Sequence, residues 1–311
     1  MARTSPTNLA ASVRQRLLNH ARTHHEELQF VLGRYGVERL LYRLGQSPTM
    51  AERFILKGAT LFYLWDGAPH RLTRDVDFLG SGDPTPETVA DAIRTVCTAV
   101  VEHDGLIFLA ETVAADVIRE DHAYGGVRVT LTVLLGTARI PLQIDVGFGD
   151  AVTPAAELTI FPTLLDLPAP CIRAYPAETL VAEKFQAMVA LGIATSRMKD
   201  YYDLWWLART RHFDGTQLAD AIEATFARRH TPLPDYAPAA LTNTFWNDRA
   251  KQIQWSAFKD RARLAEAPDS LQTVVEFIAT FVLPPALARR HNVPFLAHWP
   301  LAGPWDGAEE K

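Results

Sequence analysis

The stretch Arg74-Asp75-Val76-Asp77-Phe78 places two carboxylates on a short apolar strand. Side chains alternate along a strand, so Asp75 and Asp77 point the same way while Val76 and Phe78 face the core. Two neighbouring carboxylates repel each other unless a cation lies between them. A hard divalent cation such as Mg²⁺ suits this pair, because it prefers oxygen ligands and often also binds substrate phosphates. The alternative is two exposed aspartates at the end of a strand.

A third carboxylate is predicted on a neighbouring strand. Residues 127–135 and 140–146 alternate apolar side chains around a Gly-Thr turn, which is the pattern of a β-hairpin. Asp145 lies on the second of these strands, which is otherwise apolar. If the hairpin pairs beside the strand of Asp77, three carboxylates meet and can hold two metal ions. The alternative is a charged residue that protects an edge strand from aggregation.

A turn ahead of the two aspartates predicts a phosphate-binding site. Lys57, Gly58 and Thr60 lie between a short apolar strand and a short helix. Glycine lets a ligand approach the backbone closely, and the start of a helix offers N–H groups to an anion. Thr60 can add a hydroxyl group. The alternative is an ordinary turn that contains a single glycine.

Two predicted helices in the second half carry charged residues where apolar ones are expected. Lys184 lies on the apolar stripe of its helix, so its ammonium group either extends to solvent or meets an anion. In the next helix Asp200 and Asp203 share a face because they are three residues apart. A buried aspartate could orient Lys184 or Lys199 toward a triphosphate. The alternative is an ordinary helix start, where the dipole favours negative charge.

The order of the predicted elements indicates an α+β fold with two domains, in a chain of 311 residues. Residues 1–170 form a small mixed β-sheet core flanked by helices, including N-terminal helices, and residues 171–311 form a helical C-terminal domain. Helices are predicted at 8–32, 37–44, 86–104, 176–191, 197–210, 216–229, 239–264 and 269–283. A Pro-rich linker is predicted at 154–170, and an irregular tail after 283 is anchored by Phe295, Trp299 and Trp305.

The bulk composition indicates a globular protein of a reducing compartment. Hydrophobic residues make up 48% of the chain, charged residues 22%, and there are only two cysteines. No apolar run reaches the roughly 18 residues that span a bilayer, and the polar N-terminus lacks the apolar centre of a signal peptide. We therefore expect a cytoplasmic protein with no membrane partner.

The net charge of −5 does not by itself favour nucleic acid, so a polyanion would need a local basic groove. Basic residues of the helical domain are candidates for contacts with an RNA backbone. They are Arg228, Arg229, Lys259, Arg261 and Arg263. The alternative is a solvated helix face.

Four segments together resemble the AbiEii/AbiGii toxin family of nucleotidyltransferases, the group that includes the mycobacterial MenT toxins. The segments are Leu56–Thr60, Arg71–Phe78, Ala182–Ala187 and Ser196–Leu204. They lie between about residues 54 and 207, roughly half of the chain, and their joint order is specific. The family commonly has two glycines where this chain has Gly58-Ala59.

The resemblance implies a DNA polymerase β-like nucleotidyltransferase core, in a toxin of a bacterial toxin–antitoxin or phage-defence pair. Asp75 and Asp77 would be ligands of Mg²⁺, Lys184 would contact the nucleotide phosphates, and Asp200, with Asp203 as second choice, would be the essential acidic residue. Some members add nucleotides to the 3′ end of tRNA. The nucleotide-binding residues would be Lys57, Gly58, Thr60, Thr73, Lys199 and Asp203.

The resulting hypothesis is a metal-dependent toxin that transfers NMP from an NTP to the 3′ end of tRNA and so blocks translation. Its partners would be NTP, the tRNA acceptor end and a cognate antitoxin, and the helical domain would complete the active site. Asp145 would be a third metal ligand, by the strand alternation described above. One alternative is a nucleotidyltransferase acting on a protein side chain or a small molecule. Another is a non-enzymatic binding module with a degenerate site.

Overall fold

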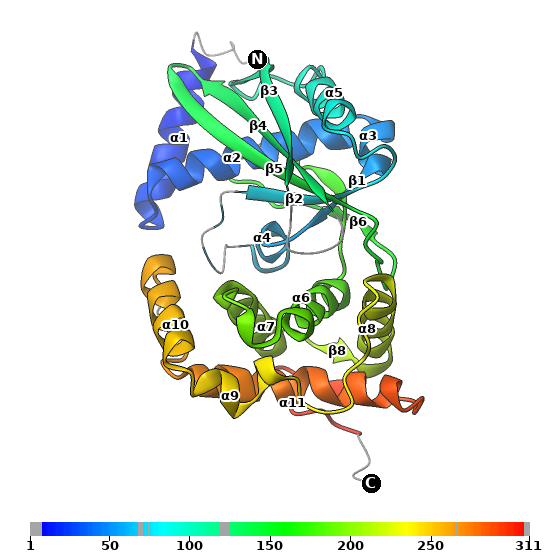
Figure 1. The fold of residues 1–311 in the computed structure, drawn as a ribbon. Helices are drawn as coiled ribbons and strands as arrows, with labels where there is room; N and C mark the ends of the chain where they lie inside the picture. Colours follow the sequence, from blue (N-terminus) through cyan, green and yellow to red (C-terminus); the bar gives the residue numbers. More distant parts are fainter. Residues whose placement is uncertain are drawn as a thin grey trace. The chain divides into compact units, whose positions relative to one another are not determined.

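The computed structural model describes residues 8–67, 71, 73, 75–118, 125–264 and 266–307. The chain divides into two compact units. Unit 1 consists of residues 1–149 and 157–174, and unit 2 consists of residues 150–156 and 175–311. The α+β class is confirmed, with a mixed sheet in unit 1 and helices in unit 2 (Figure 1).

Among the described residues, a seven-stranded mixed sheet forms the centre of unit 1, with the order β3-β4-β5-β2-β1-β7-β6. The pairs β2–β5 and β1–β7 are parallel, and the other pairs are antiparallel. The strands are β1 (Phe54–Lys57), β2 (Asp75–Gly80), β3 (Leu106–Ile118), β4 (Gly126–Leu135), β5 (Ala138–Phe148), β6 (Glu157–Ile160) and β7 (Cys171–Ala174).

The predicted hairpin is confirmed as β4 and β5, and β5 lies beside β2 as the three-carboxylate hypothesis requires. Three strands of this sheet, β3, β6 and β7, were not predicted, and β7 lies in the part of the chain that was predicted to be helical. The pairing of β3 with β4 is interrupted between Leu109 and Ala114, so β3 lacks a continuous alternation. The short edge strand β6 lies inside the stretch predicted to be a linker and leaves Leu158 and Ile160 exposed. Strands β3 and β6 depend on long-range pairing more than on local pattern.

Helices α1, α2 and α5 pack on the sheet: α2 contacts β5 and β7, and α5 contacts β3 and β4 (Figure 1). The helices of unit 1 are α1 (Leu9–Thr23), α2 (Leu28–Gly45), α3 (Pro48–Arg53), α4 (Thr60–Asp66) and α5 (Pro86–Cys97).

The prediction of one helix over residues 8–32 and a second from 37 is wrong. The chain breaks after α1, where His25 has a φ of 54° and the N–H of Glu26 donates to Ala21. Helix α2 then continues through Gly36, where an added Cβ would meet the side chain of Leu142 at 3.1 Å. Glycine there permits close packing of α2 on β5, so it does not end the helix.

A buried ionic network fixes α2 to the loop before β3. Arg43 Nη1 lies 2.6 Å from Asp104 Oδ2, and Arg39 Nε lies 3.2 Å from the same oxygen. The hydroxyl of Tyr35 donates to the Asp104 carbonyl at 2.6 Å. Burial opposes ionisation of Asp104, but the hydrogen bond and charge of Arg43 prevail and lower its pKa. The network therefore holds α2 rigidly beside the sheet.

Unit 2 is helical, with a short sheet between β8 (Phe213–Asp214) and β9 (His298–Trp299). The predicted helices are confirmed, except that the long segment 239–264 is broken into a 3-10 turn and two helices. They are α6 (Ala177–Leu191), α7 (Met198–Thr210), α8 (Gly215–Arg228), α9 (Asn243–Trp246), α10 (Arg249–Ala262) and α11 (Leu271–Arg290), with 3-10 turns at 192–194 and 239–241.

Helix α11 continues past the predicted end at 283, through Pro284 and Pro285, to Arg290. Proline lacks the N–H that would bond the carbonyl four residues earlier. The Phe281 carbonyl instead accepts a hydrogen bond from the indole of Trp305 at 2.9 Å. The tail thus supplies the donor that Pro285 removes, and its predicted aromatic anchors are confirmed.

Within the described residues, α11 is also long and apolar enough to cross a membrane by length and composition. Buried side chains recur at helical spacing along it, at Leu271, Val274, Ile278, Val282 and elsewhere. The helix contacts α7 and α8. A buried core helix passes the same test, so this feature is weak support for a membrane span.

Candidate active site

The two carboxylates of β2 lie as strand alternation predicted. Val76 and Phe78 are buried, whereas Asp75 and Asp77 are only partly buried. Asp77 lies directly opposite Lys57 on β1 and opposite Asp145 on β5. These three residues therefore form one row across three adjacent strands, and the row is the centre of the candidate site in unit 1.

The phosphate turn and Asp77 are parts of one local structure. Gly58 has a φ of +73°, a conformation that residues with a Cβ rarely adopt. A Cβ on Gly58 would lie 2.0 Å from Asp77 Oδ2 and 2.8 Å from the Asp77 Cβ. Any larger residue at this position would displace the carboxylate. Glycine is therefore required both by the backbone and by the close approach of Asp77.

Asp145 is bound by Arg128 of β4, a residue that the sequence analysis missed. Arg128 Nε lies 2.8 Å from Asp145 Oδ1, and Nη2 lies 2.7 Å from Oδ2. The hydrogen bond to Asp145 is the largest cause of a raised Arg128 pKa, which the charges of Asp75 and Asp77 also favour. The signal was present in the sequence. Counting outward from a two-residue turn at Gly136-Thr137 pairs Arg128 with Asp145.

The donor set on β2 fits a magnesium ion that uses few protein ligands. In the described parts of the chain, no group of three His, Cys, Asp or Glu side chains converges as a possible metal site. Mg²⁺ commonly binds one or two carboxylates and completes its shell with water and substrate phosphates. Asp75 and Asp77 match that requirement. The role of Asp145 as a third ligand stays a prediction, since its oxygens are held by Arg128.

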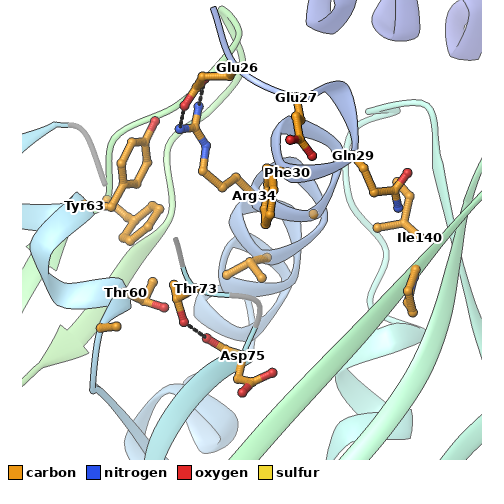
Figure 2. Close-up of a pocket in the computed structure, with 15 residues that line it drawn as sticks. Glu26, Glu27, Gln29, Phe30, Arg34, Thr60, Tyr63, Thr73, Asp75 and Ile140 are labelled. Carbon is orange, nitrogen blue, oxygen red and sulfur yellow. Dashed lines mark hydrogen bonds and ion pairs between the residues drawn. The ribbon is translucent and has the colours of Figure 1, made fainter. Parts of the chain in front are cut away.

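The remaining predicted residues of unit 1 lie around the same row. Thr60 is buried at the start of α4, and Thr73 donates its hydroxyl to the Asp75 main-chain carbonyl at 3.3 Å (Figure 2). Leu72 and Arg74 of the matching segment lie outside the described residues. Their contribution to the site therefore rests on the sequence alone.

A cavity of about 280 Å³ adjoins the row and was not predicted (Figure 2). Thr60, Thr73 and Asp75 form part of its wall, together with residues of α2, α4 and β5. Arg34 of α2 is held by Glu26, with its Nη1 at 2.7 Å from Oε1 and its Nη2 at 3.1 Å from Oε2. The cavity joins segments that are distant in sequence, so no local pattern indicated it.

In unit 2, Lys184 forms the centre of a buried ionic cluster. Its Nζ lies 2.7 Å from Asp200 Oδ1 and 2.8 Å from Asp203 Oδ2. Burial of Asp200 opposes its ionisation, but the charges of Lys184 and Arg197 prevail and lower its pKa. The side chain of Lys199 is exposed, and Arg197 contacts Asp200 instead. The structure thus places Asp200 and Asp203 on Lys184, while their roles in a reaction stay predictions.

Arg229 does not have the position expected of an RNA contact. Its guanidinium is half-buried, with Nη2 at 2.9 Å from Asp150 Oδ1 and Nη1 at 2.9 Å from the side-chain oxygen of Gln186. Lys259 is bound to Asp269. The prediction that Arg229 meets an RNA backbone stays a prediction, and internal acceptors already hold its guanidinium.

The comparison with protein families agrees with the resemblance seen in the sequence. Residues 39–277 match the family model described as "Nucleotidyl transferase AbiEii toxin, Type IV TA system". The crystal structure of JHP933 from Helicobacter pylori is similar, with 15% identity and a TM-score of 0.46 over 89% of this chain and 94% of that chain. A second H. pylori structure, described as a candidate nucleotidyltransferase, has 15% identity and a TM-score of 0.44 over 90% of this chain and 98% of that chain. No curated protein matches the chain.

Proposed function

The chain belongs to the AbiEii family of nucleotidyltransferase toxins, and we propose that it transfers a nucleoside monophosphate from an NTP to the 3′-hydroxyl of tRNA. The type IV toxin–antitoxin family implies a cognate antitoxin partner. The observation that carries the proposal is the position of Asp77, which lies against Gly58 and in one row with Lys57 and Asp145. The reaction would block translation in the cytoplasm.

The nucleotide is proposed to bind at the row through its phosphates. Asp75 and Asp77 would hold Mg²⁺, which when bound neutralises phosphate charge and orients the leaving pyrophosphate. Lys57 and Thr60, which carry an ammonium group and a hydroxyl group, are the first and last residues of the phosphate turn. The N–H groups of Leu61 and Phe62 already donate to the carbonyls at 58 and 59, so phosphate contacts fall to residues 57–60.

In the transfer, the acceptor hydroxyl oxygen forms a bond to the α-phosphorus while the bond from phosphorus to pyrophosphate breaks. The hydroxyl proton leaves as the new ester forms. Asp145 is proposed to accept that proton or to bind a second metal ion. Either role requires at least one of its oxygens to be released by Arg128, which holds both. Arg128 is then a positioning residue for Asp145.

Lys184 and Asp200 of unit 2 are proposed to serve the same reaction, as the family resemblance implies. Lys184 would contact phosphate, with Asp203 fixing its ammonium group, and exposed Lys199 would add charge. A buried lysine whose charge is held by two carboxylates is preorganised, so it loses little freedom on binding. Substitution of Lys199 by methionine, measured as NTP affinity, separates its contribution from the cluster's.

The direct test incubates the full chain with α-³²P-labelled NTPs, Mg²⁺ and total tRNA. We expect label in tRNA from at least one NTP, lost on omission of Mg²⁺ and in Asp77→Asn. Asp166→Asn, which changes an exposed aspartate of the same unit, is the matched control and keeps activity. If no NTP labels RNA, the tRNA proposal fails. Label in a protein or a small molecule would support the alternative acceptor.

The non-enzymatic alternative predicts a different result in cells. A binding module would remain toxic when Asp77 is changed to asparagine, since sequestering a partner needs no chemistry. The proposed transferase loses toxicity in that variant while Asp166→Asn retains it. Growth of cells expressing each variant without antitoxin, at equal protein levels, decides between the two.

A further inference from the structure

The cavity of unit 1 continues directly from the proposed phosphate and metal site. Thr60 belongs to the phosphate turn and Asp75 to the carboxylate row, and both line the cavity (Figure 2). If the phosphates of a nucleotide bind at that row, its sugar and base can therefore reach the cavity. This argument rests on the proposed function, because it takes the position of the phosphates from it.

The lining suits a flat aromatic ring. Phe30 of α2 and Tyr63 of α4 supply aromatic surfaces, and Ile140 and Pro141 of β5 supply apolar ones. Small-molecule sites commonly measure about 300–1,000 Å³, so a cavity of about 280 Å³ has room for one ring system. Nucleobases commonly bind proteins by stacking on aromatic side chains, and any of the bases can stack in this way.

The walls of the cavity are held in place before any ligand binds. The guanidinium of Arg34 lies 5.2 Å from the centre of the Tyr63 ring, and Tyr63 packs on Phe161 at 5.4 Å. Burial raises the pKa of Tyr63, so its ring stays neutral at physiological pH. A preformed pocket loses little free energy to ordering when it binds a ligand.

Charge distinguishes the base of the NTP from the base of an RNA acceptor. The lining described by the structure carries the carboxylates of Glu26, Glu27 and Asp75, and Arg34 is already paired with Glu26. An RNA strand would bring several phosphates to this acidic rim, whereas a single base carries no charge. Glu27 and Gln29 offer hydrogen-bonding groups to the edge of a base. We propose that this cavity binds the nucleobase of the donor NTP.

Gly33 provides a way to fill the cavity without disturbing the fold. It lines the cavity within α2, and a Cβ added there meets nothing within 4 Å among the described residues. Alanine and leucine also favour a helix more than glycine does. Gly33→Leu therefore occupies the space intended for the base. Ser12→Leu, which adds the same side chain to the exposed face of α1, is the matched control.

The experiment measures binding of each of the four NTPs, and of inorganic tripolyphosphate, to the full chain with Mg²⁺ by calorimetry. In Gly33→Leu we expect affinity for the preferred NTP to fall by about 5- to 150-fold, the range that corresponds to loss of one stacked base. Affinity for tripolyphosphate should be unchanged, because it has no base. Gly33→Ala should lower NTP affinity less than Gly33→Leu does. Phe30→Ala should lower affinity for NTP but not for tripolyphosphate, and Ser12→Leu should bind both as wild type does.

The outcomes separate the two proposals. Equal NTP affinity in Gly33→Leu and wild type would overturn the assignment of the cavity and leave the transferase proposal intact. Weaker binding of tRNA with unchanged NTP affinity would assign the cavity to the acceptor and also overturn it. If wild type binds neither NTP nor tripolyphosphate, the proposed function fails and the inference fails with it.

Discussion

Two groups of acidic residues in this chain contain the same kinds of side chain in opposite surroundings. Asp75 and Asp77 of unit 1 lie side by side on β2 and are partly exposed. Asp200 and Asp203 of unit 2 are buried, and one oxygen of each lies within 2.8 Å of Lys184 Nζ. The first group is partly exposed to solvent, whereas the second is buried around an ammonium group. Removing a charge in unit 1 should therefore cost activity with little loss of folding stability, whereas removing a charge in unit 2 should also cost folding stability.

Removal of the central cation should have the largest effect. Lys184→Met leaves Asp200 and Asp203 buried without the ammonium group that neutralises them. Breaking a buried ion pair from one side typically costs about 3–5 kcal/mol. We expect the free energy of unfolding, measured with urea, to fall by that amount. Lys199→Met, on the exposed side of α7, should stay within about 0.5 kcal/mol of wild type.

A loss of less than about 1 kcal/mol in Lys184→Met would contradict this comparison. It would mean that the buried cluster of unit 2 tolerates the loss of its cation as well as a surface ion pair does. Any defect in nucleotide transfer could then be assigned to chemistry alone.

The complementary change in unit 1 should affect activity with little effect on folding. Asp77→Asn keeps the shape of the side chain that lies against Gly58 but removes its charge. Removing one such electrostatic group commonly lowers kcat by about 10²–10³-fold. We expect that loss in tRNA labelling, with unfolding changed by less than about 1 kcal/mol because Asp77 is partly exposed. If Asp77→Asn lost several kcal/mol of folding stability but kept its activity, the roles assigned to the two groups would be reversed.

The open group also depends on a glycine, and its contact can be isolated. Gly58→Ala places a Cβ against Asp77 at a φ of +73°, so it should destabilise unit 1 by about 1–3 kcal/mol and lower activity. Gly82→Ala is the control, since Gly82 has a φ of +87° with nothing within 4 Å of its Cβ among the described residues. Gly82→Ala therefore introduces the backbone strain of a positive φ without a new contact to another side chain. Equal activity in the two variants would show that Asp77 does not need the close approach.

Much of the open group could be predicted because it depends on local periodicity. Alternation along β2 gave the common side of Asp75 and Asp77, whereas the place of Asp145 beside Asp77 depends on the long-range pairing of β5 with β2. The two-residue turn sets the register of β4 with β5. That register pairs Asp145 with Arg128, which was not predicted. Helical spacing likewise placed Asp200 and Asp203 on one face.

The features that were missed depend on contacts between distant segments. Strands β3 and β6 are defined by their partners, and their own patterns are irregular. The cavity arises where α2 passes α4 and β5, so its lining is spread over more than a hundred residues. The turn between α1 and α2 was hidden by apolar spacing that continued across it. Local sequence therefore specified the carboxylates but not the pocket beside them.

The smallest predicted effect concerns the response of the two units to pH. Burial raises the pKa of Glu38 in unit 1 to about 7, although the Leu164 N–H and Arg39 oppose the shift. Because the folded chain binds this proton more tightly than the unfolded chain, stability falls as pH rises from about 4.5 through 7. Asp200 of unit 2 has the opposite sign, since its lowered pKa contributes stability that is lost as pH falls.

The test compares unfolding of wild type and Glu38→Gln at pH 6 and pH 7. Wild type should lose up to about 1 kcal/mol relative to the variant over this interval, since one pKa unit corresponds to about 1.4 kcal/mol. Glu102→Gln, which changes an exposed glutamate of the same unit, should follow wild type. If Glu38→Gln and wild type change in parallel, Glu38 is ionised throughout, and the carboxylate that supports α2 beside the cavity is charged at neutral pH.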